Sequence, residues 1–237
     1  MSFKFKPFIE KRLEREVFTG LPLTVFVTIF LILLATFVGI TDSIVNSAAI
    51  VKIDNNFANF LYLLRTPSLA KIFYIITNLA DPTIITIPVG IALVYLYFKK
   101  EIAYLYAFLL TFIGTSGSVF LLKIFINRAR PGASIAYYLE GSKSFPSGHS
   151  AIAMAVFGFV VYYLLHHVMW KDKKFILILF GTILIGLIGF SRLYLDVHFL
   201  SDVIGGFLMG GLWLVAGITF RERHFYIASL KKGKNTP

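Results

Sequence analysis

A histidine and an aspartate toward the C-terminal end of the chain have the spacing of neighbours on one helix face, since His198 and Asp202 are four residues apart. A carboxylate that holds one imidazole nitrogen fixes the tautomer and leaves the other nitrogen free to attack or to accept a proton. Arg192 adds a planar guanidinium that suits phosphate. An ion pair at a membrane boundary would use the same residues, so both interpretations stay open for this cluster alone.

Two cations precede a proline in a second cluster. A helix that continued through this segment would place Lys123 and Arg130 on one face, and Pro131 would end it. Two cations on one face suit a ligand with several anionic oxygens. The alternative is a pair of anchors that extend to the membrane boundary, which are common at helix ends.

The third cluster, Pro146-Ser147-Gly148-His149, begins an apolar stretch. Proline and serine favour a helix start, and glycine lets a backbone approach a ligand closely. The free amides of a helix N-terminus bind phosphate. The alternative is an ordinary helix cap beside an unrelated histidine.

Long apolar stretches must position these clusters. The chain has 237 residues, of which 57% are hydrophobic and 15% charged, which excludes intrinsic disorder. It has no cysteine, which excludes disulfides and thiol chemistry. Six stretches with at most one charged residue approach or exceed the roughly 20 residues that cross a bilayer. They are residues 21–41, 72–98, 102–122, 150–170, 175–191 and 203–220.

The sequence therefore predicts an all-α polytopic membrane protein, a bundle of six transmembrane helices. We expect the first stretch to be a retained helix, because it is too long for a signal peptide and no small-x-small cleavage site follows it. Of the 23 Lys and Arg residues, fifteen lie either before the first stretch or directly after the second, the fourth or the sixth stretch. The positive-inside rule then places both termini in the cytoplasm and the three clusters on the extracytoplasmic side. The net charge of +11 is thus a topology signal and implies no nucleic-acid partner.

The expected organisation is a basic cytoplasmic segment (1–20), a membrane domain (21–220) and a basic cytoplasmic tail (221–237). Residues 42–71 fit an amphipathic helix at the membrane interface or a plain extracytoplasmic loop equally well. Asp81, followed by Pro82, is interpreted as the outer start of a helix. Glycines in the last stretch predict close packing within the bundle, and they are Gly205, Gly206, Gly210 and Gly211.

Taken together, the three clusters resemble the signature of the type 2 phosphatidic acid phosphatase (PAP2) superfamily. The blocks are Lys-x6-Arg-Pro, Pro-Ser-Gly-His and Ser-Arg-x5-His-x3-Asp, in this order and at the outer ends of predicted spans. All the specified residues match: Lys123, Arg130, Pro131, Pro146, Ser147, Gly148, His149, Ser191, Arg192, His198 and Asp202. The resemblance covers about residues 70–220, and it implies hydrolysis of phosphate monoesters or pyrophosphates without a metal or a cofactor.

The resemblance also implies roles for single residues. His198 corresponds to the nucleophile, Asp202 to its orienting partner and His149 to the acid that protonates the leaving group. The residues implied in phosphate binding are Lys123, Arg130, Ser147, Gly148 and Arg192. The expected partners are membrane lipids and a lipid phosphate substrate, such as phosphatidylglycerol phosphate, phosphatidic acid, undecaprenyl pyrophosphate or a phosphorylated lipid A. The alternatives are a lipid phosphotransferase with the same phosphohistidine and a non-catalytic lipid-binding protein, against which the two histidines argue.

Overall fold

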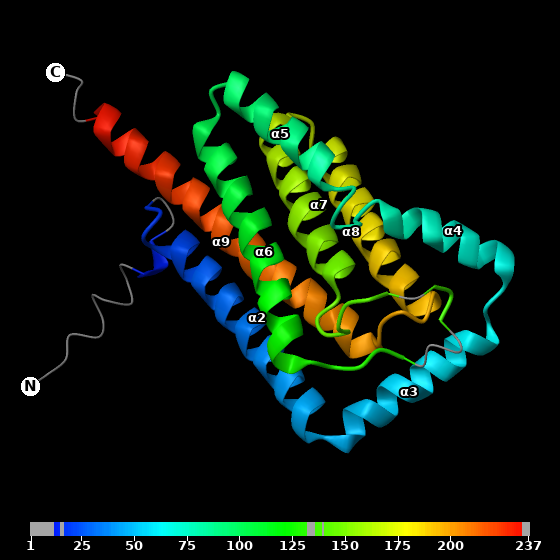
Figure 1. Cartoon of the computed structure of the whole chain (residues 1–237). Coiled ribbons are helices and arrows are strands. Elements are labelled where there is room, and N and C mark those ends of the chain that lie inside the picture. The colour runs from blue at the N-terminus through cyan, green and yellow to red at the C-terminus, as the bar shows by residue number, and fades with distance from the viewer. Residues whose placement is uncertain (1–11, 15–16, 132–135, 139, 234–237) are drawn as a thin grey trace, which may run out of the picture.

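The computed structural model describes residues 12–14, 17–131, 136–138 and 140–233, and within these residues the regular structure is helical, as predicted (Figure 1). The longer helices are α2 (Leu21–Asn46), α3 (Ala48–Leu63), α4 (Pro67–Asn78), α5 (Thr86–Phe98), α6 (Ile102–Ile126), α7 (Gly148–His167), α8 (Lys171–Tyr194) and α9 (Leu200–Gly233).

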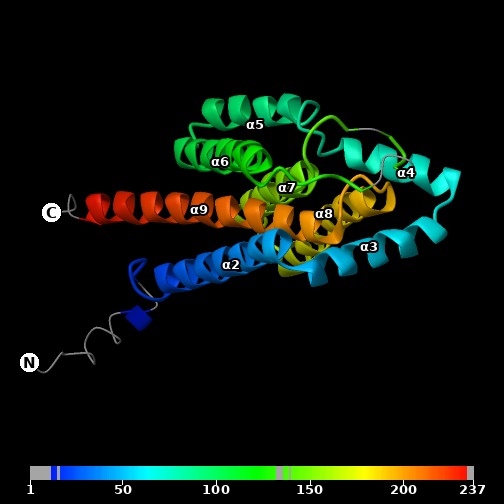
Figure 2. The ribbon, with the colours of Figure 1, turned by 60° about the horizontal axis from the view of Figure 1, so that its bottom comes forward.

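The bundle is organised around α9, which contacts α2, α6, α7 and α8. Figure 1 and Figure 2 both show α9 running through the middle of the long helices. A Cβ atom at Gly206 would lie 2.5 Å from the Ser147 carbonyl oxygen, and one at Gly210 would lie 2.3 Å from that of Ala151. Because only glycine permits this approach, the expected close packing within the bundle is confirmed for these two positions.

In the part of the chain that the structure describes, five helices are long and apolar enough to cross a membrane, namely α2, α6, α7, α8 and α9. The chain is thus a multi-pass membrane protein. The expected span at residues 72–98 is not one continuous helix, because α4 ends at Asn78 and α5 begins at Thr86. With 13 residues α5 is about 20 Å long, against a hydrocarbon core of about 30 Å. The sixth crossing and the side on which the termini lie remain predictions.

The break between α4 and α5 has a local cause. The Asp81 Oδ1 atom accepts hydrogen bonds from the backbone N–H groups of Thr83 and Ile84, at 2.9 and 3.1 Å. These bonds satisfy the free donors of a new helical turn, and Pro82 has no N–H to continue the old one. The interpretation of Asp81 as the start of a helix is off by about one turn, because α5 begins at Thr86 and its N-cap is Ile85.

Residues 42–71 are mostly helical, since α2 extends to Asn46 and α3 and the start of α4 follow. A plain loop is thus the wrong interpretation of this segment, while its place at the membrane interface remains a prediction. Figure 1 shows α3 and α4 beside one end of the bundle, opposite the end where α2 begins and α9 stops. The α9 helix passes residue 220 without a break, so no change in secondary structure marks the expected domain boundary there.

Candidate active site

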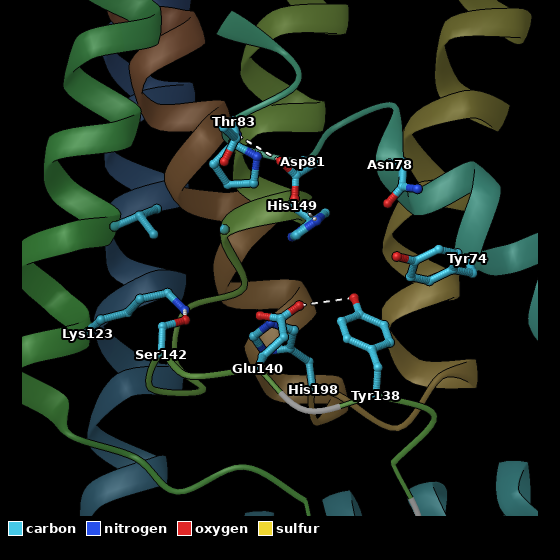
Figure 3. Close-up of a pocket in the computed structure, with 13 residues that line it drawn as sticks. Tyr74, Asn78, Asp81, Thr83, Lys123, Tyr138, Glu140, Ser142, His149 and His198 are labelled. Atoms are coloured by element: carbon cyan, nitrogen blue, oxygen red, sulfur yellow. Dashed lines mark hydrogen bonds and ion pairs between the residues drawn. The ribbon is translucent and has the colours of Figure 1, made fainter.

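The three sequence clusters converge at the end of the bundle beside α3, where α6 and α8 end and α7 and α9 begin (Figure 1). A cavity of about 310 Å³ lies between them. Lys123, Gly148, His149 and His198 line it, together with residues from the α4–α5 connection. Figure 3 shows His149 with Asp81 on one side of the cavity, and His198 with Glu140 and Tyr138 on the other. Groups more than 70 residues apart in sequence thus face one space.

His198 lies in the connection between α8 and α9 and is only 2% exposed. Its Nδ1 atom is 3.6 Å from Oδ2 of Asp202, in the first turn of α9. Ser144 completes the arrangement, because its hydroxyl donates to the same Oδ2 at 2.5 Å and lies 3.4 Å from Nδ1. The backbone N–H of Phe199 donates to Oδ2 as well, at 2.8 Å. The predicted pair is thus bridged by a serine that the sequence clusters did not include.

The other ring nitrogen of His198 lies 3.1 Å from NH1 of Arg130. A guanidinium can only donate, so this hydrogen bond requires an unprotonated Nε2 and places the ring proton on Nδ1, toward Asp202. Burial lowers the pKa of His198 well below its usual value, and the charges of Arg130 and Arg192 lower it further. The imidazole is therefore neutral, with its lone pair on Nε2, which is the form a nucleophile needs.

Arg130 and Arg192 converge on one anionic group, which in this structure is the side chain of Glu140. NH2 of Arg130 is 2.7 Å from Oε2, and NH2 of Arg192 contacts Oε1. Burial by itself would raise the pKa of Glu140, but the charges of the two guanidinium groups help to lower it to about 2. A permanently charged carboxylate thus occupies a position where two guanidinium groups could bind a phosphate.

Arg192 is fully buried and is fixed by further hydrogen bonds. NH1 donates to Thr77 Oγ1 at 2.8 Å and also to the Tyr138 hydroxyl. Thr77 belongs to α4, so a helix outside the three clusters also holds this guanidinium. Sequence analysis missed Glu140, although it is the only acidic residue between Glu101 and Asp172. A single carboxylate within a basic, apolar segment was the signal that could have identified it.

The expected helix through Lys123 and Arg130 is wrong. The α6 helix ends at Ile126, and Asn127 adopts a left-handed conformation with φ of 49°. The two cations meet instead through Ser142, whose hydroxyl lies 3.0 Å from Lys123 Nζ and 3.0 Å from Arg130 NH2. Lys123 also donates to the Lys143 carbonyl oxygen at 2.5 Å. The loop after α6 therefore brings the cations together.

The Pro-Ser-Gly-His cluster forms the start of α7. The Ser147 side chain is the N-cap of the helix, and its Oγ accepts a hydrogen bond from the Ser150 hydroxyl at 3.0 Å. Gly148 and His149 line the cavity, whereas Ser147 is buried behind them. Nε2 of His149 is 3.6 Å from Oδ2 of Asp81. Asp81 thus contacts a site histidine in addition to holding the turn before α5, a contact that sequence analysis did not predict.

No group of three or more His, Cys, Asp or Glu residues that could hold a metal ion occurs among the residues that the structure describes. The cavity instead combines cations, helix-end amides and two imidazoles. Such a set can bind an anion with several oxygens, attack it and protonate a leaving group.

Comparison with known proteins agrees with this site. The PAP2 superfamily matches residues 101–226, which contain all three clusters. The chain belongs to the PAP2 superfamily. Phosphatidylglycerophosphatase B of Bacillus subtilis is 42% identical over 109 residues, which are 44% of this chain and 53% of that protein. A PA-phosphatase related-family protein of Dictyostelium discoideum is 37% identical over 76 residues, 30% of this chain and 21% of that protein. These matches span about half of the first relative and a fifth of the second.

Two solved structures extend the similarity to most of this PAP2 chain. The crystal structure of a transmembrane PAP2 type phosphatidylglycerolphosphate phosphatase from Bacillus subtilis superposes with a TM-score of 0.75 and 29% identity, over 82% of this chain and 96% of that one. The crystal structure of Aquifex aeolicus LpxE gives a TM-score of 0.55 and 25% identity, over 72% and 95% of the two chains. The helices outside residues 101–226 thus belong in part to the shared fold.

Proposed function

We propose that the protein is a membrane lipid phosphatase that works through a phosphohistidine on His198. The observation that carries the proposal is the state of this residue. A buried, neutral imidazole presents Nε2 beside Arg130, while its Nδ1 is held by Asp202 and Ser144. An ordinary ion pair at a membrane boundary would not need a nitrogen fixed as an acceptor next to an anion-binding group.

In the first step, the substrate phosphate displaces Glu140 from Arg130 and Arg192, and Lys123 and the amides at the start of α7 neutralise its remaining oxygens. Nε2 of His198 then attacks phosphorus in line, and a P–N bond forms as the P–O bond to the lipid breaks. Protonated His149 gives its proton to the departing oxygen, so that the lipid leaves as an alcohol or a phosphate. Asp202 stabilises the positive charge that develops on the imidazole of His198.

In the second step, water attacks the phosphorus of the phosphohistidine. His149, now neutral, takes a proton from this water, the P–N bond breaks, and inorganic phosphate leaves the three cations. His149 is then protonated again and His198 is neutral, so both residues are ready for another turnover. No step requires a metal ion.

A lipid phosphate is favoured as the substrate because the cavity lies at the ends of apolar helices. A phosphate can reach the cavity there while its acyl chains stay in hydrocarbon, which avoids an extraction cost of about 0.8 kcal/mol per CH₂. We favour phosphatidylglycerophosphate because a similar sequence and a similar solved structure, both from Bacillus subtilis, are named as phosphatases of this lipid. The distribution of basic residues favours the extracytoplasmic side for the site and the cytoplasm for both termini.

The test is phosphate release by the purified protein from phosphatidylglycerophosphate, phosphatidic acid and undecaprenyl pyrophosphate, with EDTA present and with an acceptor lipid added. We expect release of inorganic phosphate, fastest from phosphatidylglycerophosphate, no loss of rate in EDTA, and inhibition by vanadate. Transfer of the phosphate to the acceptor lipid would support the phosphotransferase alternative. Recovery of an EDTA-treated enzyme by a divalent ion would contradict the metal-independent mechanism.

A further inference from the structure

Behind the cavity, one arginine joins two buried carboxylates. NH1 of Arg128 is 2.6 Å from Oδ1 of Asp202, and NH2 is 2.6 Å from Oδ2 of Asp54. The side chains of Arg128, Asp54 and Asp202 are 10%, 1% and 0% exposed. Arg128 thus occupies the oxygen of Asp202 that points away from His198, whereas Oδ2 is left for Ser144 and the imidazole.

Asp54 belongs to α3 but is tied to the start of α9. It accepts hydrogen bonds from the backbone N–H of Ser201 at 3.0 Å and from its hydroxyl at 2.5 Å. The Ser201 hydroxyl in turn accepts a bond from Arg128 at 2.7 Å. Asp54 therefore contacts both the residue before Asp202 and the guanidinium that holds Asp202. It is the only acidic residue between Asp42 and Asp81.

We propose that Asp54 and Arg128 are positioning residues that set the orientation and the effective charge of Asp202. This inference rests on the proposed function, in which Asp202 stabilises the charge that develops on His198. A fixed Oδ1 leaves the carboxylate one orientation, with Oδ2 toward Nδ1. This contact assigns a role in catalysis to α3, which lies outside residues 101–226 that match the family.

The charges of the cluster explain why two carboxylates are needed. Without Asp54, the positive charge of Arg128 would be balanced by Asp202 alone. This would weaken the attraction between Asp202 and the positive charge that develops on His198 in the first step. Asp54 pairs with one of the two terminal nitrogens of Arg128 and so offsets part of its positive charge. The negative charge of Asp202 then remains available to attract His198. A role limited to fastening α3 to the bundle would require no connection between Asp54 and Asp202.

The experiment compares Asp54→Asn with a matched control, Lys52→Gln, on an exposed position of the same helix. Turnover, KM, vanadate inhibition and thermal unfolding are measured in one detergent. We expect Asp54→Asn to lower kcat about tenfold, which is within the range of couplings in a hydrogen-bonded network, and to leave KM and vanadate inhibition unchanged. The control should match the wild type in all four measurements. Equal kcat values for Asp54→Asn and the wild type would overturn the proposal.

A double-mutant cycle distinguishes a role of Asp54 in positioning Asp202 from a role limited to holding α3 against the bundle. We repeat Asp54→Asn in an Asp202→Asn background, with an activated aryl phosphate whose good leaving group keeps the slow reaction measurable. If Asp54 acts through Asp202, the second substitution changes the rate less than about twofold. A tenfold loss in both backgrounds would show an independent structural role and contradict the inference. Arg128→Lys, which keeps the charge but loses the two-pronged geometry, gives the same comparison if Asp54→Asn does not fold.

The outcomes also separate this inference from the proposed function. An active wild type, an inactive His198→Ala variant and a fully active Asp54→Asn variant would refute the positioning role alone. A wild type that releases no phosphate, or a His198→Ala variant that releases it normally, would refute the phosphatase mechanism itself.

Discussion

The two histidines of the cavity are supported to very different degrees. His198 is 2% exposed and is surrounded by Asp202, Ser144 and Arg130, each with an atom within 3.6 Å of a ring nitrogen. His149 is 7% exposed, and the carboxylate beside it belongs to Asp81, whose side chain is 31% exposed. One imidazole is locked on both nitrogens, and the other faces the space where a ligand would bind.

This difference matches the demands of the two proposed roles. A nucleophile must present one nitrogen in one direction, so a rigid and buried network suits it. A residue that gives a proton in one step and takes it from water in the next must remain accessible to both leaving group and water. Substitutions on the two sides of the cavity should therefore fail in different ways.

The largest effect is expected for His198→Ala. Among the residues that line the cavity, His198 is the one whose ring nitrogen lies beside Arg130, so turnover should fall by at least about 10⁴-fold for every substrate. The measurement is phosphate release, together with acid-labile labelling of the protein by radioactive substrate. A near-normal rate in this variant would show that the comparison assigns the nucleophile to the wrong histidine.

His149→Ala should be almost as damaging with a lipid substrate, but not with an activated one. Loss of a general acid costs about 10² to 10⁴-fold when the leaving group is a poor one. Aryl phosphates leave without a proton, so their rate of phosphohistidine formation should fall far less. Single-turnover assays with a lipid phosphate and p-nitrophenyl phosphate, which report phosphohistidine formation alone, check this, and an equal loss with both would remove the distinction between the two sides.

The sequence predicted catalytic residues on both sides of the cavity, but few of the contacts that support them. The pairing of His198 with Asp202 follows from their spacing, whereas Arg130 reaches His198 from a loop where a helix was expected. Contacts made across the fold have no such pattern. These contacts depend on how the loops and α3 close over the helix ends, and they involve Asp54, Ser144, Glu140 and the pair Asp81 and His149. A single polar residue in an apolar segment does not reveal which residue it will contact. The break at Asp81 likewise divides an apolar stretch whose hydropathy alone predicted one span.

Asp81→Asn tests the weaker support of His149. The carboxylate lies 3.6 Å from Nε2 of His149 and helps to hold the ring, so its loss should misplace the proposed general acid. In single-turnover assays we expect phosphohistidine formation to be several-fold slower with lipid phosphates and unchanged with p-nitrophenyl phosphate. Asn retains an oxygen that can accept the hydrogen bonds from Thr83 and Ile84, so thermal unfolding should change little. The same loss with both substrates would mean that Asp81 acts on the fold and not on His149.

Glu140→Gln tests the place between Arg130 and Arg192 where the substrate phosphate is proposed to bind. The carboxylate competes with phosphate for Arg130 and Arg192, and its pKa of about 2 keeps it charged at every working pH. Removing this charge should lower both KM and the vanadate concentration for half inhibition several-fold. The side chain of Gln keeps the shape of Glu and leaves the arginines a hydrogen-bond acceptor. A weaker affinity for vanadate would show that Glu140 organises the arginines and does not block them.

The smallest expected effect is a shift in the pH profile on the His198 side. Burial, together with the charges of Arg130 and Arg192, holds the pKa of His198 well below 6.5. Only the neutral imidazole attacks, so the acid limb of kcat/KM that reports His198 should lie below pH 6.5. Removing a nearby positive charge favours the protonated imidazole, so Arg130→Gln should move this limb to higher pH, by about one unit.

Arg130→Lys is the matched control, because it keeps the charge and should leave the limb near its original pH. Both variants bind phosphate less well, but the comparison uses the position of the limb and not its height. The same substrate is used throughout, so its own ionisation contributes equally to every profile. If the limb of Arg130→Gln stays in place, the neutral state of His198 does not depend on Arg130, and this arginine serves the phosphate and not the nucleophile.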